Sequence, residues 1–193
     1  MRQDFSQVSA ERLAKLFPVV LAEHNPNWAK CYEEEKDFLQ SVFQEKALRI
    51  SHIGSSAVPG LLAKPTIDIL LEVNKDCDLE AITERMLDEG YVVNMPKSDL
   101  ILYLKGYTPQ GFLGQAMHIH VRHVGDWGEL YFRDYLIAHP NVMNEYAVLK
   151  RNLKEQYPND RDGYTDAKGQ FVQKYTELAR QEFCGRYDPA ALQ

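Results

Sequence analysis

The sequence predicts an α+β or α/β fold, in which a mixed β-sheet with helices is followed by a helical C-terminal part. Residues 66–73 form a β-branched and nearly continuous apolar run, as expected of a central strand. Other strand patterns and two helical patterns surround this run before Gly125, and only helical patterns follow Gly125. This order of elements favours a sheet with helices packed on it.

One domain is expected for residues 1–193, with the mixed sheet and its helices in 17–125 and the helical part in 126–185. A length of 193 residues suits one domain. The chain is 45% hydrophobic and 26% charged, which is typical of a globular protein with a substantial core.

The pattern up to Val73 predicts an amphipathic lead-in, one helix and three strands. Pro18 places the first strand near a strand start or a sheet edge, because proline has no N–H for the ladder. Asn27 can cap the helix, and two glycines with two prolines in 54–65 predict a loop or short helix. The expected bounds are 1–16 for the lead-in, 28–43 for the helix, and 17–22, 47–53 and 66–73 for the strands.

From Leu79 the pattern predicts one further helix, three strands and then three helices. Gly90, Pro140 and Pro158 are helix stop signals, and a loose tail with Pro189 is expected. The expected bounds are 79–90 for the first helix, 91–93, 100–107 and 115–124 for the strands, and about 128–139, 141–157 and 161–183 for the last helices.

Charge and apolar content exclude two classes of partner. The formal net charge of −6 argues against a broad nucleic-acid surface, but a single nucleotide needs only a few local cations or a metal. Cys31, Cys77 and Cys184 lack C-x-x-C spacing and are expected to be free thiols in a reducing compartment. No apolar run has the ~20 residues of a membrane span, and the N-terminus lacks a signal core. We therefore expect a cytoplasmic protein that does not bind membranes.

A Gly-Ser turn is the first candidate for a binding element. Gly54 permits a tight turn and a close backbone approach. The hydroxyl and N–H groups of Ser55 and Ser56 can hold phosphate oxygens if a helix follows. The alternative is an ordinary strand-to-helix turn capped by serine.

Asp68 is the second candidate, because it is an acid inside an apolar strand. A buried carboxylate costs about several kcal/mol unless it is paired, protonated or bound to a cation. Alternate residues of a strand share a face, so we expect Asp68 and Glu72 to flank a metal or phosphate site. The alternative is that Asp68 pairs with Lys64 or Arg49 and that Glu72 is a strand-end charge.

Histidines and cations complete the candidates. His118 and His120 share one face of a strand and can ligate a metal or bind phosphate, although such a pair is also common as a structural feature. If His52 converges with them, three imidazoles suit a transition metal better than Mg²⁺ alone. Cations of the helical part can contact phosphate or can simply be solvated; they are Arg133, Lys150, Arg151, Lys154 and Lys168.

Several segments resemble the GrpB family. Residues 52–60, HIGSSAVPG, carry the most specific part of this resemblance, which covers about residues 18–180. The other segments are HNPNW at 24–28, KPTIDIL at 64–70, HIH at 118–120, FRDYL at 132–136 followed by His139-Pro140, and YTDAK at 164–168. The resemblance implies the fold of the nucleotidyltransferase superfamily, with a palm-type sheet.

That superfamily's pattern is a hydrophobic residue, Gly and then Gly or Ser, followed after about a dozen residues by Asp-x-Asp or Asp-x-Glu on a strand. The resemblance implies that the turn at Gly54 holds phosphates and that Asp68 binds Mg²⁺, which activates the attacking hydroxyl and stabilises the leaving pyrophosphate. The chain departs from the pattern at Leu70, which replaces the second carboxylate. It also has His118 and His120 where a later acid is expected.

The leading hypothesis is a protein that binds a nucleotide or phosphorylated small molecule with a divalent metal, Mg²⁺ or Mn²⁺, and can transfer a nucleotidyl group. Its catalytic residues would be Asp68 and Glu72. The expected metal ligands are Asp68, Glu72, His118 and His120. The expected phosphate contacts are Gly54, Ser55, Ser56, Lys64, Arg133 and Lys168.

Two alternatives are a non-catalytic module and a hydrolase. Some GrpB-like segments are fused to dephospho-coenzyme A kinase, which implies a nucleotide-binding or accessory module linked to coenzyme A metabolism. Leu70 favours this alternative. A metal-dependent hydrolase would use Asp68 and the histidines, but no His-x-His-x-Asp or His-Glu-x-x-His arrangement is present. The acceptor substrate and the oligomeric state are left open.

Overall fold

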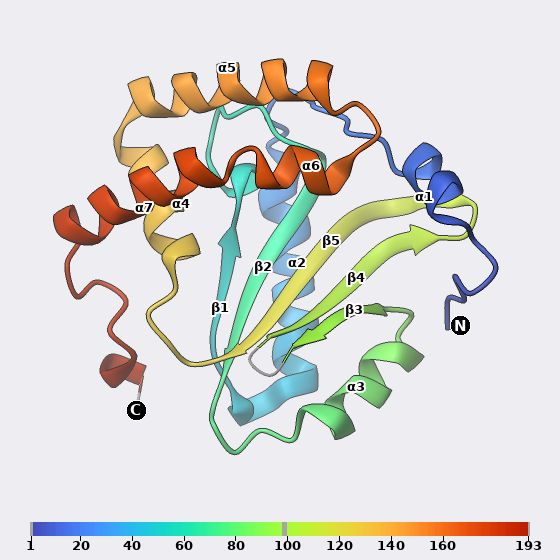
Figure 1. The fold of residues 1–193 in the computed structure, drawn as a ribbon. Coiled ribbons are helices and arrows are strands. Elements are labelled where there is room, and N and C mark those ends of the chain that lie inside the picture. Colours follow the sequence, from blue (N-terminus) through green and yellow to red (C-terminus); the bar gives the residue numbers. More distant parts are fainter. Residues whose placement is uncertain (1, 98–99, 193) are drawn as a thin grey trace.

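The computed structural model describes residues 2–97 and 100–192 and contains one five-stranded sheet (Figure 1). The strand order is β1-β2-β5-β4-β3. The strands are β1 (Ala47–Ile53), β2 (Thr66–Val73), β3 (Val92–Lys97), β4 (Leu100–Thr108) and β5 (Gly111–His123).

Seven α-helices and three short 3₁₀ helices complete the described chain. The α-helices are α1 (Ala10–Leu16), α2 (Asn27–Phe43), α3 (Leu79–Asp88), α4 (Gly128–Ala138), α5 (Pro140–Gln156), α6 (Arg161–Asp166) and α7 (Gly169–Glu182). The 3₁₀ helices are η1 (Gln44–Lys46), η2 (Ser55–Ala57) and η3 (Pro189–Leu192).

The sheet is mixed because β2 and β5 run parallel, whereas the other three neighbouring pairs are antiparallel. The parallel pair aligns Asp68 with His118 and Leu70 with His120. Side chains alternate between the two faces of a strand. The acid and both imidazoles therefore lie on the same face of the sheet.

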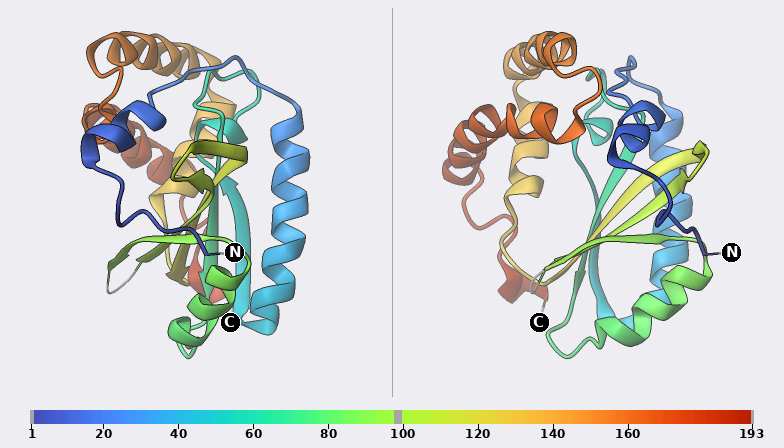
Figure 2. Two further views of the ribbon diagram at one scale, coloured as in Figure 1. Left: turned by 90° about the vertical axis from the view of Figure 1, so that its right-hand side faces the viewer. Right: turned by 45° about the vertical axis from the view of Figure 1, so that its right-hand side comes forward.

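Helices cover both faces of the sheet (Figure 2). On one face, Ile67, Ile69 and Leu71 of β2 belong to an apolar core shared with α2 and α3. On the other face, Leu70 packs against Leu130 of the helical part. The face that carries Asp68 is thus the one covered by the C-terminal helices.

Most of the expected elements are present close to their expected bounds. The strands 47–53 and 66–73 match residue for residue, and the mixed sheet followed by helices confirms the predicted fold class. Local pattern was sufficient for β2 because it is a nearly continuous apolar run that helices cover on both faces.

Two expectations about single elements were wrong. Residues 17–22 form no strand, and their one bridge pairs Ala22 with Ala63. The Val19 N–H donates instead to the carbonyl of Pro158, 2.9 Å away. The last predicted helix is divided into α6 and α7, with Lys168 as the N-cap of α7.

Within residues 2–97 and 100–192, no helix combines the length and apolar content needed to cross a membrane.

Candidate functional site

The Gly54 turn lies directly against Asp68. Gly54 has a φ of +69°, a conformation that favours glycine, and the 3₁₀ helix η2 follows it. A Cβ atom placed on Gly54 would lie 2.6 Å from Oδ2 of Asp68. The carboxylate therefore faces the turn, as the sequence predicted, and position 54 leaves no room for a side chain.

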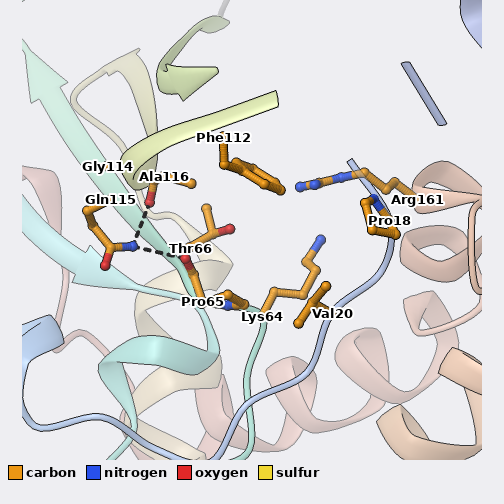
Figure 3. Close-up of a pocket in the computed structure, with 10 residues that line it drawn as sticks. All are labelled: Pro18, Val20, Lys64, Pro65, Thr66, Phe112, Gly114, Gln115, Ala116 and Arg161. Carbon is orange, nitrogen blue, oxygen red and sulfur yellow. Dashed lines mark hydrogen bonds between the residues drawn. The ribbon is translucent and has the colours of Figure 1, made fainter. Parts of the chain in front are cut away.

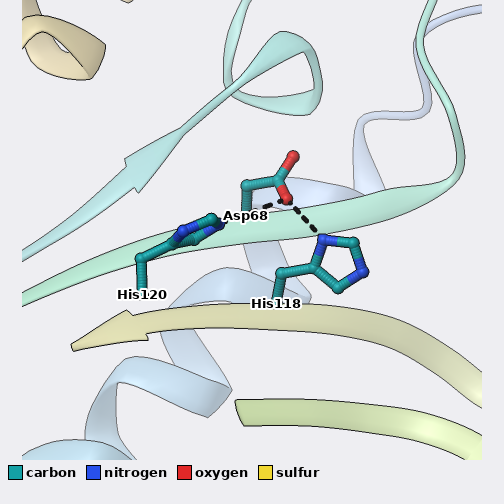
Figure 4. A group of neighbouring side chains, drawn as sticks. All are labelled: Asp68, His118 and His120. Carbon is teal, nitrogen blue, oxygen red and sulfur yellow. Dashed lines mark hydrogen bonds and ion pairs between the residues drawn. The ribbon is translucent and has the colours of Figure 1, made fainter. Parts of the chain in front are cut away.

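Asp68 meets both predicted histidines. Nδ1 of His118 lies 3.0 Å from Oδ1 of Asp68, and Nε2 of His120 lies 3.9 Å from the same oxygen. Figure 4 shows the two rings approaching the carboxylate from β5. One ligand atom from each residue can be chosen so that all three lie within 4.8 Å of one another.

The Asp68 carboxylate is ionised at neutral pH. Burial by itself would raise its pKa, but the hydrogen bond from His118 and the neighbouring imidazole of His120 hold the pKa below its usual range. The Asp68 side chain is 29% exposed to solvent, so a ligand can reach it.

A hydrogen-bond relay fixes the ring of His118. Its Nε2 lies 2.7 Å from the hydroxyl of Tyr107, and the guanidinium of Arg161 donates to that hydroxyl across 3.1 Å. An ionised carboxylate only accepts hydrogen bonds, so Nδ1 of His118 carries the proton toward Asp68 and Nε2 accepts from Tyr107. The ring can also ligate through Nδ1 in its other tautomer, which donates to Tyr107 from Nε2.

The three side chains fit a transition metal better than Mg²⁺. Ligands held about 2.1 Å from one ion are separated by about 3.0–3.4 Å for bond angles of 90–109°, and the His118–Asp68 separation is 3.0 Å. Two imidazoles and one carboxylate are a typical donor set for Zn²⁺, Mn²⁺ or Fe²⁺, whereas Mg²⁺ prefers oxygen ligands.

Glu72 does not join this group, contrary to the expectation from the sequence. Its side chain is 0% exposed, and Oε1 accepts from Nη2 of Arg49 at 2.9 Å and from the N–H of Gly125 at 3.2 Å. Four residues along a strand also span about 13 Å, which is too far for Asp68 and Glu72 to bind one ion. Arg49 thus neutralises Glu72, and Asp68 is free of it.

Lys150 reaches the turn from the helical part. Its ammonium donates to Oγ of Ser55 across 3.0 Å and to the carbonyl of Leu62. The side chain is only 2% exposed. Burial, followed by the positive charges of Lys168, Arg151 and Lys64, lowers the pKa of Lys150 to about 7.

Lys64 and Lys168 lie on the ring of one tyrosine. Their ammonium nitrogens are 5.5 and 4.5 Å from the ring centroid of Tyr164. Burial and then Arg161 lower the pKa of Lys64, while burial and then Lys64 lower that of Lys168 to about 8. Repulsion between neighbouring cations thus adds to burial in lowering these pKa values.

Arg133 is not part of this cationic cluster, which consists of Lys64, Lys150, Arg161 and Lys168. Arg133 pairs with Asp134 at 2.7 Å and donates to the carbonyl of His52 and the hydroxyl of Tyr187. The expectation that it binds phosphate is therefore not supported, because its donors already bind the protein.

His52 does not converge with the other imidazoles. Its ring stacks on Tyr32 with centroids 4.8 Å apart, and its Nε2 lies 3.1 Å from Oγ of Ser56. Burial lowers the pKa of His52 to about 4, so the ring is neutral at pH 7. The Ser56 hydroxyl is thereby occupied, as the Ser55 hydroxyl is by Lys150.

Sequence reasoning ranked Lys150 below Arg133 and did not select Tyr107 or Arg161. Lys150 lies on the buried face of α5 with Tyr146, Ala147 and Leu153. A lysine at a helical spacing from apolar residues was the available signal. Tyr107 and Arg161 had no local signal, because their link to His118 joins residues distant in the sequence.

Comparisons with known proteins place these features in one family. The family model described as GrpB protein matches residues 18–178. A glutamate-rich protein GrpB from Alkalihalophilus pseudofirmus is 38% identical over 159 residues, covering 80% of this chain and 91% of that protein. The UPF0157 protein YqkA of Bacillus subtilis is 36% identical over 166 residues, covering 84% of this chain and 48% of that protein. This chain thus spans about half the length of YqkA.

This chain is also similar to a solved structure and to an enzyme. The crystal structure of conserved protein GrpB from Enterococcus faecalis aligns with a TM-score of 0.75 and 28% identity, covering 85% of this chain and 99% of that one. A dephospho-CoA kinase from Mycolicibacterium paratuberculosis is 26% identical over 186 residues, covering 83% of this chain and 46% of the kinase.

Proposed function

Because this chain belongs to the GrpB protein family, and because its acid site adjoins a cluster of cations, we propose that it binds a nucleotide or another phosphorylated small molecule. Lys64, Lys150 and Lys168 neutralise the phosphates in this proposal. Gly54 and Ser55 supply backbone donors at the turn. Asp68 with His118 and His120 holds a divalent ion beside them.

The cationic cluster is the observation that carries this proposal. None of its four members forms an ion pair with a carboxylate within the described residues. Three of them are lysines whose pKa values are lowered, as expected for cations without such a partner. Burying like charges together costs free energy unless an anion compensates them. A phosphate group supplies that compensation with several acceptor oxygens.

The metal in this proposal is Mn²⁺ or Zn²⁺, because Asp68 is the one carboxylate in the group that the structure brings together. Such an ion offsets phosphate charge and polarises a bound hydroxyl or water. Asp68, His118 and His120 would hold it, and the relay from Arg161 through Tyr107 orients His118.

Calorimetric titration with ATP, GTP, CTP and UTP in the presence and absence of Mn²⁺ tests the proposal. We expect binding that requires the ion and that Asp68→Asn abolishes. Asp76→Asn is the matched control, because Asp76 is an exposed acid in the turn after the same strand. Equal affinities of the wild type and Asp68→Asn for all four nucleotides would contradict the proposal.

Two functions remain compatible with such binding, and one assay separates them. Nucleotidyl transfer would release pyrophosphate when nucleotides and acceptors are mixed with the protein. A non-catalytic module would bind without releasing it. Leu70 at the second carboxylate position and the neutralisation of Glu72 by Arg49 favour the module.

The similarity to dephospho-CoA kinases supports a link to coenzyme A metabolism within this second function. The similar segment makes up 46% of the Mycolicibacterium paratuberculosis protein, which suggests that a unit like this chain accompanies a kinase there. Dephospho-coenzyme A therefore belongs in the titration panel. Its binding in competition with a nucleotide would support the accessory module.

A further inference from the structure

A cavity of about 330 Å³ lies beside the cationic cluster (Figure 3). It is enclosed by the segment before α2, the start of β2 and the β4–β5 hairpin. Apolar groups form much of its wall, including Pro18, Val20, Pro65 and Phe112. Ligand sites commonly have volumes of about 300–1,000 Å³, so this cavity suits one small group rather than a large cofactor.

The cavity lies two residues along β2 and β5 from the acid site. Thr66 and Ala116 line it and are partners across the parallel pair β2–β5. Two positions further along, on the same face, β2 carries Asp68 and β5 carries His118, and these two residues are also partners. Two residues of a strand span about 7 Å, so one ligand can occupy both places.

The charges of the cavity wall select an anionic ligand. Among the residues that the structure describes, Lys64 and Arg161 are its two charged lining residues, and no carboxylate lines it. In Figure 3 the guanidinium of Arg161 points toward the ring of Phe112, and the ammonium of Lys64 extends into the same space. Arg161 is also the donor to Tyr107, and Lys64 adjoins Lys168, so the cavity and the acid site share these residues.

Phe112 offers an aromatic surface to this space. It is 45% exposed, and the guanidinium carbon of Arg161 lies 6.0 Å from its ring centroid. Aromatic rings and guanidinium planes are the surfaces on which nucleobases stack in proteins. An exposed phenylalanine beside an arginine, in a cavity that leads to lysines, therefore matches a molecule with a planar ring at one end and phosphates at the other.

We propose that this cavity is the base subsite of a nucleotide, which stacks its ring on Phe112 while its phosphates extend past Lys64 to Lys168 and Asp68. This assignment rests on the proposed function and deepens it, because it specifies a nucleotide among phosphorylated small molecules.

The test compares nucleoside triphosphates with inorganic tripolyphosphate, which carries the phosphates without the ring. The wild type, Phe112→Ala and Leu113→Ala are titrated calorimetrically with tripolyphosphate, ATP, GTP, CTP and UTP, each with Mn²⁺. Leu113 is the matched control because it is 71% exposed and points to the opposite side of the strand from its neighbour. Circular dichroism melting verifies that each variant is folded.

We expect at least one nucleotide to bind the wild type more tightly than tripolyphosphate does, by about 5-fold to 100-fold, as stacking on one aromatic residue provides. Phe112→Ala removes this advantage and leaves the affinity for tripolyphosphate unchanged, while Leu113→Ala keeps it. Equal binding of nucleotides and tripolyphosphate, or an advantage that survives Phe112→Ala, would overturn the base subsite but not the phosphate site. No binding of any of the five anions would overturn both.

Discussion

At the scale of single residues, environment gives chemically similar side chains different roles. Asp68 and Glu72 lie on one face of one strand, but Arg49 neutralises only Glu72. Asp68 keeps its charge beside two imidazoles and remains partly exposed. Likewise Lys150 lies at the turn, whereas Arg133 is held by Asp134. The candidate site therefore gathers cations that form no ion pair with a carboxylate in the described part of the chain, beside a carboxylate that two imidazoles leave partly exposed.

Glu72→Gln is expected to destabilise the fold without loss of metal binding. The substitution leaves the guanidinium of Arg49 without its anion in a buried setting, which costs about 3–5 kcal/mol of unfolding free energy. Urea denaturation measures this loss. The double variant Arg49→Met/Glu72→Leu should recover part of it, because neither residue of the pair then leaves the other as an unpaired buried charge. A loss of Mn²⁺ affinity in folded Glu72→Gln as large as in Asp68→Asn would show that Glu72 is a ligand.

The affinity for tripolyphosphate is expected to fall as pH rises from 7 to 9. The pKa values of Lys150 and Lys168 are lowered to about 7 and about 8, so these lysines lose their protons in this range. Each such lysine weakens anion binding by up to about tenfold per pH unit above its pKa.

Lys168→Arg provides the control for that pH dependence, because a guanidinium stays charged throughout the range. Calorimetric titrations of the wild type and this variant at several pH values should give a flatter profile for the variant. Identical steep profiles would show that Lys168 does not contact the anion.

At the scale of elements, a turn and a strand pair create the site. The turn after β1 brings Gly54 against Asp68, and the parallel register of β2 and β5 places both histidines beside that acid. Parallel strands hold their partners at a regular spacing, so the three ligating side chains are fixed by the ladder itself. The helix-rich half then contributes cations from α5 and α6 and from Lys168 at the start of α7.

Gly54→Ala should abolish Mn²⁺ binding, whereas Gly60→Ala should not. Both glycines have positive φ values, +69° and +80°, so each substitution strains the backbone, at a cost of about 1–3 kcal/mol of unfolding free energy. Only the Cβ at position 54 meets the Asp68 carboxylate, since nothing lies within 4 Å of a Cβ at position 60. Metal titration and thermal melting of both variants separate the two effects. Equal Mn²⁺ affinities would place the ion away from the turn.

At the scale of the whole molecule, the site joins the sheet to the helical part. Lys64 and Asp68 come from the sheet side, while Lys150, Arg161 and Lys168 come from the helices. A cluster of buried residues formed by Val58, Leu61 and Leu62 with residues of α4, α5 and α7 holds the two parts together. A ligand that contacts both parts would therefore stabilise their packing.

Hydrogen exchange is expected to slow in both parts when tripolyphosphate and Mn²⁺ bind. Protection should cover residues 54–57 on the sheet side and residues 150 and 161–168 on the helical side, because binding raises the free energy of opening. The thermal midpoint should rise with ligand concentration at the same time. Protection confined to one part would contradict a site shared between them.

Elements and groups that depend on local pattern could be predicted from the amino-acid sequence. An apolar β-branched run defined β2 and exposed Asp68 as an exception within it, and period-two spacing placed His118 and His120 on one face. A glycine before two serines marked the turn. These features follow from steric rules that act over a few residues, so one sequence was sufficient to predict them.

Which charges compensate one another depends instead on the folded arrangement of distant segments. The partner of Glu72 lies on a neighbouring strand, and Lys150 meets Ser55 across 95 positions of the chain. The segment 17–22 has strand-like residues, yet Val19 bonds to Pro158 outside the sheet. Ion pairs and hydrogen bonds of this kind depend on distances that packing sets after folding, and no local pattern in the sequence encodes those distances.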